Sequence, residues 1–128
     1  MTSHDAEARR AAWQEGLQAE AYVADLLARV GWTVLDRNWS GGGGELDAVV
    51  LRDGKLRMVE VRARTDDEVV PVEETITTHK RARLRSAARA WLLDHEPDYD
   101  EVAFLVALVD LGTDPWSVTW IDDAFDGA

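Results

Sequence analysis

The chain has 128 residues, of which 46% are hydrophobic and 30% are charged, so it is long enough to bury a core within one domain. It contains no cysteine, which excludes disulfides, thiolate metal sites and cysteine nucleophiles and favours a reducing cytoplasmic environment. The formal net charge of −11 argues against a protein that coats nucleic acids generally, because such proteins are normally basic.

The first half of the chain is predicted to contain one helix and three strands. Hydrophobic periodicity predicts a helix over residues 4–30, which Gly31 is suited to end. Its apolar stripe consists of Trp13, Leu17, Ala24 and Leu27. A short strand is expected at 33–37, and then a flexible loop that includes Trp39, Ser40 and the glycines 41–44. Two strands follow, at about 45–52 and 55–64.

The second half is predicted to contain one helix and two strands. An acidic loop at 66–74 leads to a helix at about 78–94, whose buried positions are Leu84, Ala87, Ala88 and Trp91. Strands are expected at 102–109 and 117–121, and residues 122–128 are expected to be a loose acidic tail. This order predicts one α/β domain over 1–128, with a mixed central sheet that helices cover on both faces. No apolar run approaches the length of a membrane span, so no membrane association is expected.

The pair Asp53-Gly54 predicts a hairpin and thereby fixes which residues face each other. The numbers of paired residues sum to 107, which places Asp47 opposite Glu60 and Glu45 opposite Arg62. Like charges in opposed positions destabilise a sheet unless something compensates them, and a divalent cation would do so. The alternative is that both acids lie at a solvated strand end. We favour the metal because Glu60 lies within an apolar run.

Glu20 falls in the middle of the apolar stripe predicted for the first helix. An unpaired carboxylate in that position is costly, so it needs a partner, a proton or a metal. A salt bridge to an arginine at the core edge, such as Arg62, is one interpretation. A third acidic group beside Asp47 and Glu60 is the other, and the sequence alone favours neither.

Basic residues are concentrated in one segment of this acidic chain. Five of the 14 basic residues lie within 80–89, and Arg57, Arg62 and Arg64 lie on the second hairpin strand. Arg81, Arg85 and Arg89 share one face of the predicted helix because they are four residues apart. Such a strip fits a polyanion bound with strong salt sensitivity, although it is equally typical of a solvated helix face.

Four segments of the sequence resemble the YraN-like family of bacterial endonucleases. They are GLQAEA at 16–21, GWTVLDRN at 31–38, GELD at 44–47 and VEVRAR at 59–64. The resemblance continues through Lys80, Leu84, Ala88 and Trp91-Leu92 to the ending WIDDAF at 120–125. The family is similar to archaeal Holliday-junction resolvases, and the resemblance implies a restriction-endonuclease-like fold.

The resemblance also implies a set of functional residues. The signature of that fold is a helix Glu, a strand Asp and a Glu-x-Lys on the next strand, so Glu20, Asp47 and Glu60 would bind Mg²⁺ or Mn²⁺, with the Val61 carbonyl as a further ligand. Arg62 stands where the signature has Lys, and Arg can stabilise charge but cannot act as a general base. The basic strip, and not the resemblance, supplies the candidates for DNA contact, which are Lys80, Arg81, Arg85 and Arg89, and the secondary candidates for the site are Glu45 and Arg64.

These observations together predict a metal-dependent endonuclease that hydrolyses phosphodiesters in DNA, including branched DNA, with a homodimer allowed. The alternative is a catalytically inactive nuclease-fold module that binds DNA or a protein partner. Metal affinity separates the two, because a binding module has no reason to hold Mg²⁺ between Asp47 and Glu60.

Overall fold

The computed structural model describes residues 3–64 and 76–124. The elements in chain order are α1 (Ser3–Arg29), β1 (Thr33–Gly41), β2 (Gly44–Arg52), β3 (Lys55–Arg64), α3 (Thr78–His95), β4 (Glu101–Asp110) and β5 (Ser117–Asp122). The predicted acidic loop at 66–74 and the last residues of the predicted tail, 125–128, lie outside the described residues. Neither described helix combines the length and apolar character needed to cross a membrane.

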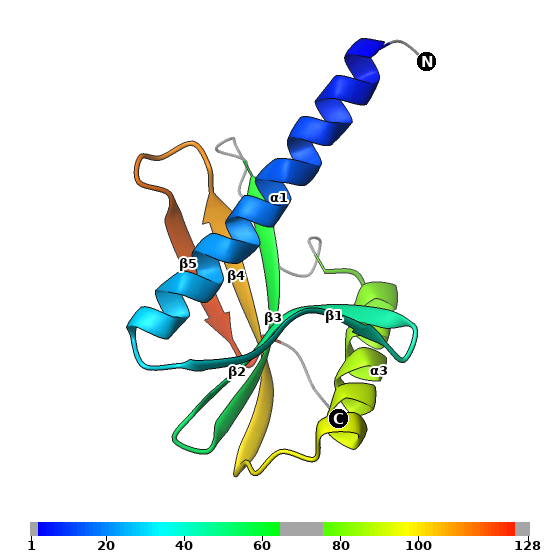
Figure 1. Ribbon diagram of the computed structural model, residues 1–128, viewed down its shortest axis with the longest axis vertical. Coiled ribbons are helices and arrows are strands. Elements are labelled where there is room, and N and C mark those ends of the chain that lie inside the picture. The colour runs from blue at the N-terminus through cyan, green and yellow to red at the C-terminus, as the bar shows by residue number, and fades with distance from the viewer. Residues whose placement is uncertain (1–2, 65–75, 125–128) are drawn as a thin grey trace.

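The five strands form one mixed sheet with helices on both faces. The spatial order is β1-β2-β3-β4-β5, and β3 and β4 are parallel while the other neighbours are antiparallel. The connection between the parallel strands passes through α3, as a parallel pair requires. Figure 1 shows α1 lying across one face of the sheet and α3 packed on the other. The predicted α/β class, a mixed central sheet flanked by helices, is therefore confirmed, and it is the architecture that a restriction-endonuclease-like fold requires.

Two apolar cores lie on opposite faces of this sheet, because side chains alternate along each strand. The core under α3 contains the predicted helix residues Leu84, Ala87, Ala88 and Trp91, together with Leu56, Met58, Phe104 and Val106 from the sheet. The core under α1 contains Ala19, Val23, Leu27, Ala48, Val50, Val59, Leu105 and Val109. The prediction that both faces of the hairpin are covered is confirmed.

The stripe predicted for α1 is wrong at its N-terminal end. Trp13 is 67% exposed, whereas Ala24 and Leu27 are buried as expected. Figure 1 gives the reason, since the first turns of α1 extend beyond the edge of the sheet. Burial along the helix begins at Ala19, and Glu20 follows it directly at a half-buried position.

The loop predicted at 39–44 is instead the end of a β-hairpin. Strand β1 continues to Gly41, which pairs with Gly44, so Gly42 and Gly43 alone form the turn. Both turn residues have positive φ, 60° and 82°, which a two-residue hairpin turn requires and glycine adopts without strain. A run of four glycines predicts a flexible loop because glycine disfavours strands, but here its middle pair forms the turn of a hairpin.

This hairpin is docked on the backbone of α3. The Ser86 hydroxyl donates a hydrogen bond to the Gly42 carbonyl at 2.5 Å. A Cβ at Gly42 would lie 2.6 Å from the Ser86 carbonyl oxygen, and a Cβ at Gly44 would collide with the Arg83 carbonyl oxygen. Glycine at both positions therefore permits the close approach of strand and helix.

The predicted acidic tail begins too early. Asp122 is the last residue of β5, and its carboxylate accepts two hydrogen bonds from Arg57, at 2.6 and 3.2 Å. Glu101 accepts a third at 2.7 Å. The side chain of Arg57 is 6% exposed, so this arginine contributes nothing to a basic surface. Beyond the strand, the Ala124 N–H donates to the Phe104 carbonyl at 3.1 Å, so the ordered sheet edge extends past 122.

Candidate active site

The β2–β3 hairpin has the register predicted from Asp53-Gly54, but the ladder is shorter than expected. Val49 faces Met58 and Ala48 faces Val59, in pairs that sum to 107. The pairing then stops, one step before Asp47 would face Glu60. In place of a ladder bond, the Asp47 carboxylate accepts a hydrogen bond from the Val61 N–H at 2.8 Å. Asp47 and Glu60 are neighbours on adjacent strands, at the point where these strands separate.

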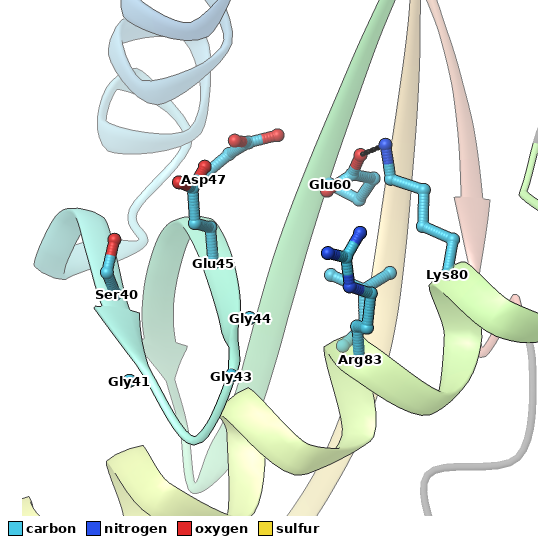
Figure 2. A pocket seen from close by; sticks show the side chains of 10 residues that line it. Ser40, Gly41, Gly43, Gly44, Glu45, Asp47, Glu60, Lys80 and Arg83 are labelled. Carbon is cyan, nitrogen blue, oxygen red and sulfur yellow. Dashed lines mark ion pairs between the residues drawn. The ribbon is translucent and has the colours of Figure 1, made fainter.

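Glu60 is a buried carboxylate with two cations beside it. It is 6% exposed, and its Oε1 lies 3.3 Å from the Arg62 Nε and 3.4 Å from the Lys80 Nζ. Figure 2 shows the Lys80 ammonium reaching Glu60 from α3. The pKa of Glu60 is raised to about 8. Burial is the largest cause, the charge of Asp47 is the second, and the charge of Arg62 acts in the opposite direction.

Glu20 joins this pair from the opposite face of the sheet. Its carboxyl shares a hydrogen bond with Asp47, and burial, followed by the Asp47 charge, raises the pKa of Glu20 to about 7. Arg62 pairs with Glu60 and not with Glu20, whereas Glu20 associates with Asp47 and the charge of Arg37 opposes the rise in its pKa. The three acids predicted from the sequence are brought together, with Asp47 in the middle.

The donor set of this cluster suits a hard divalent cation. Asp47 and Glu60 supply carboxylate oxygens, and Mg²⁺ is typically held by one or two carboxylates with water and substrate phosphate completing its shell. Within 3–64 and 76–124, no three His, Cys, Asp or Glu side chains are arranged as a ready-made metal site. The fit therefore rests on the two strand carboxylates, whose mutual repulsion a cation would relieve.

The carboxylates lie in a cleft of about 620 Å³ between the β1–β2 hairpin and α3 (Figure 2). Its lining combines acids, cations and glycine backbone: Ser40, Gly41, Gly43, Gly44, Glu45, Asp47, Glu60, Lys80, Arg83 and Leu84. Glu45, a secondary candidate, is exposed in this cleft and its charge also raises the pKa of Glu60. Arg64, the other secondary candidate, is half-buried at the far end of β3, where it faces Asp110.

Comparison with known proteins identifies the family of this chain. The profile of the family described as "Uncharacterised protein family UPF0102" matches residues 19–109. A UPF0102 protein of Synechococcus sp. (strain CC9902) is 38% identical over 110 residues, which cover 84% of this chain and 90% of that protein. The chain belongs to the UPF0102 family. A UPF0102 protein of Anaeromyxobacter dehalogenans (strain 2CP-C) is 39% identical over 124 residues, or 96% of this chain and 90% of that protein.

The UPF0102 assignment confirms the resemblance drawn from the sequence motifs, since the YraN-like proteins constitute this family. A third relative, from Rhodopseudomonas palustris (strain ATCC BAA-98 / CGA009), is 38% identical over 109 residues, which cover 84% of this chain and 82% of that protein. The matched region, 19–109, contains Glu20, Asp47, Glu60 and Lys80. All residues of the acidic cluster thus lie inside the part of the chain that defines the UPF0102 family.

Two cationic residues of this UPF0102 chain face the cleft, and sequence reasoning identified only one of them. Thr77 caps α3 by accepting a hydrogen bond from the Lys80 N–H at 3.2 Å, which sets Lys80 in the first turn. Arg83 follows one turn later on the same side. It was overlooked because its neighbours Arg81 and Arg85 form a regular strip, although its spacing of three residues from Lys80 is also a helical contact spacing.

The predicted strip lies elsewhere on α3. Arg81, Arg85 and Arg89 are not among the residues that line the cleft. The Arg81 Nε donates to the Ile76 carbonyl at 3.1 Å, and Arg89 is exposed. At about 100° per residue, these arginines occupy the flank of the helix opposite to Arg83. Their contact with DNA stays a prediction.

Proposed function

We propose that this UPF0102 protein is a metal-dependent nuclease that hydrolyses phosphodiesters in DNA. One observation supports this most strongly: two carboxylates suited to a divalent cation, Asp47 and Glu60, share a cleft with two side chains suited to phosphate, Lys80 and Arg83. Neither pair alone is diagnostic, because acid clusters and basic helices are common on protein surfaces. Their combination in one cleft matches the charge pattern of a phosphodiester in contact with Mg²⁺ or Mn²⁺.

The residues of the cleft have complementary tasks in this proposal. A bound Mg²⁺ or Mn²⁺ would polarise the phosphodiester and make water a better nucleophile at neutral pH. Asp47 and Glu60 would hold that ion, and Asp47 is fixed for this by its hydrogen bond from the Val61 N–H. Glu20 would steady Asp47 from the α1 side and take up or release a proton there, since its pKa is raised to about 7.

Arg62 forms an ion pair with Glu60 and does not act as a base. Its Nε lies 3.3 Å from the Glu60 carboxylate, and a guanidinium stays protonated in proteins. The charge of Arg62 therefore favours the ionised form of Glu60, which is the form that binds a metal. Arg83, which lines the cleft, would hold a phosphate of the DNA backbone.

DNA as the substrate, branched DNA included, rests on the resemblance to nucleases and on the cationic side of the cleft. The net charge of −11 would oppose binding anywhere else on the molecule. Contact would thus be confined to a local basic surface, with an affinity that falls as salt rises.

A second function competes with the first, since Arg62 occupies the position of the lysine in the nuclease signature. In this alternative the protein is a catalytically inactive nuclease-fold module that binds DNA or a protein partner. It would keep the cationic side of the cleft and lack a use for the acidic one.

The two functions are separated by incubating the purified protein with linear, flapped and four-way DNA in Mn²⁺, in Mg²⁺ and in a chelator. A nuclease cuts at least one substrate in the metal buffers, stops in the chelator, and loses activity in Asp47→Asn. DNA binding without cutting, combined with equal behaviour in metal and chelator, would establish the binding module instead. Comparing the three DNA forms reports whether branching matters.

A further inference from the structure

We propose that Lys80 is the cation missing from the strand motif: it stands beside Glu60 in the metal-free protein and contacts the scissile phosphate once a divalent cation occupies that carboxylate. This inference rests on the proposed nuclease function and names a further catalytic residue for it. Lys80 on α3 would thus have the role that the lysine of a Glu-x-Lys motif has on the strand.

Lys80 and Arg62 meet the same oxygen of Glu60, and their surroundings differ. The distances to Oε1 are 3.4 Å from the Lys80 Nζ and 3.3 Å from the Arg62 Nε. Lys80 lines the cleft, whereas Arg62 does not. The Arg62 Nε is buried and has no hydrogen-bond partner among the described residues, so this end of the guanidinium is enclosed beside Glu60. Of the two, Lys80 alone is placed to reach a ligand in the cleft.

The chemistry of lysine suits a change of partner. Its ammonium is compact and is carried on four flexible methylenes, so it can turn from a carboxylate to a phosphate while its backbone stays in place. The backbone of Lys80 is fixed by the cap of Thr77 on α3, at 3.2 Å. The planar guanidinium of Arg62, whose Nε is buried beside Glu60, has less freedom of this kind.

Electrostatics predict a competition at Glu60. In the metal-free protein the ammonium of Lys80 stands beside the carboxylate that a divalent cation would use. Two cations cannot share one carboxylate without repulsion, so the metal must displace Lys80. Removing the positive charge at position 80 should therefore tighten metal binding, even though it removes a group that catalysis needs.

The test compares Lys80→Met with Lys55→Met, since the chain has only these two lysines. Lys55 is exposed at the opposite end of β3 and has no place in the cleft. Mn²⁺ affinity is measured by calorimetry without DNA, and cleavage is measured at saturating Mn²⁺. We expect Lys80→Met to bind Mn²⁺ about five- to tenfold more tightly than the wild type. Its cleavage rate should fall about a hundredfold, a typical loss for a group that stabilises transition-state charge. Lys55→Met should change neither.

Lys80→Arg provides the conservative comparison and guards against a folding defect in the methionine variant. It should restore the weaker Mn²⁺ affinity of the wild type, because the charge returns, and recover only part of the cleavage. Melting curves of all three variants confirm that each is folded.

The outcomes separate this inference from the proposed function. A wild type that binds no Mn²⁺ overturns both. A wild type that binds Mn²⁺ and cuts DNA, with Lys80→Met unchanged in affinity and rate, overturns the role of Lys80 alone. If the wild type binds Mn²⁺ without cutting, the salt dependence of DNA affinity in Mn²⁺ decides: a slope unaltered by Lys80→Met rules out the phosphate contact.

Discussion

The Asp47 carboxylate holds the Val61 N–H at 2.8 Å across the gap where β2 and β3 have stopped pairing. This bond gives Asp47 two tasks at once. It closes a ladder that would otherwise leave the Val61 N–H without a strand partner, and it fixes a carboxylate that faces Glu60. The charge and the hydrogen-bond acceptor of Asp47 can be removed separately.

Asp47→Asn should keep the hydrogen bond from the Val61 N–H and lose the negative charge that faces Glu60. An amide oxygen still accepts from the Val61 N–H, while the repulsion of Glu60 disappears, so the metal-free protein should be as stable as the wild type or more so. Asp47→Ala removes the acceptor as well and should cost about 1–3 kcal/mol. Urea denaturation in a chelator measures both.

Mn²⁺ supplies the second half of this test. Added Mn²⁺ should raise the melting temperature of the wild type, because a ligand that binds only the folded state stabilises it, and should leave both Asp47 variants unchanged. Equal shifts in the wild type and in Asp47→Asn would rule out a metal site at this carboxylate.

The stability of the metal-free protein should fall as pH rises from about 4.5 to about 8. Burial raises the pKa of Glu60 from 4.5 to about 8 and that of Glu20 to about 7, so the folded state binds more protons than the unfolded chain in this range. The stabilising contribution is full below about pH 4.5 and is lost as pH passes through the raised values. The double variant Glu20→Gln with Glu60→Gln should flatten this dependence. If its pH profile runs parallel to that of the wild type, these carboxyls are not the cause.

Arg83→Ala should weaken binding to DNA of any sequence and flatten the slope of log affinity against log salt by about one unit, as loss of one phosphate contact does. The double variant Arg81→Ala with Arg85→Ala tests the strip on the other flank of α3, with a predicted change of up to about two units. A duplex that follows the cleft alone would respond to Arg83 and not to the strip. Unaltered slopes in every folded variant would remove α3 from DNA binding.

Gly44→Ala should push the β1–β2 hairpin away from α3. The new Cβ would collide with the Arg83 carbonyl oxygen, which belongs to a rigid helix backbone, and the repacking should cost about 1–3 kcal/mol. Gly16→Ala is the matched control, since a Cβ at Gly16 meets nothing within 4 Å and alanine favours a helix interior. Thermal denaturation should show opposite shifts for the two, and a neutral Gly44→Ala would show that the hairpin is free to move.

The double variant Glu101→Gln with Asp122→Asn should be more damaging than Arg57→Met. The acids are half-exposed, whereas the arginine is buried, so losing the acids leaves a buried charge uncompensated at a cost of about 3–5 kcal/mol. Arg57→Met leaves two acids that water can solvate. Chemical denaturation ranks the variants, with the exposed Asp123→Asn as a control. The reverse order would mean that Arg57 is solvated in the folded protein.

The sequence was sufficient where local chemistry decides the structure. Asp53-Gly54 has the turn chemistry of a two-residue hairpin, and the register derived from it matches the ladder from Arg52 and Lys55 to Ala48 and Val59. The buried face of α3 was also predictable, because Leu84 and Trp91 recur at helical spacing over a helix that packs along its length. The register also brought Asp47 and Glu60 together, whereas Glu20 was assigned to them only by the family resemblance, because its position in the stripe was equally compatible with a salt bridge.

The sequence was insufficient where distant parts of the chain decide. Trp13 was misplaced because periodicity shows which face of a helix is apolar and not how far the sheet beneath it extends. The β2–β3 ladder ends before Asp47, and the turn residues that set its register say nothing of where the pairing stops. Arg83 was overlooked because its importance comes from the glycine hairpin opposite, a contact between segments far apart in sequence.

The division of the cleft between the hairpin and α3 has a consequence for the nascent chain. A polypeptide synthesised only as far as β3 already carries Glu20, Asp47 and Glu60, and it lacks both Lys80 and Arg83. The parallel pairing of β3 with β4 forms only after α3 has crossed the sheet, and non-local pairings of this kind are slow. An incomplete chain therefore carries the carboxylates of the cleft without its two cations, and the cleft is complete only when synthesis has passed α3 and the crossover has closed.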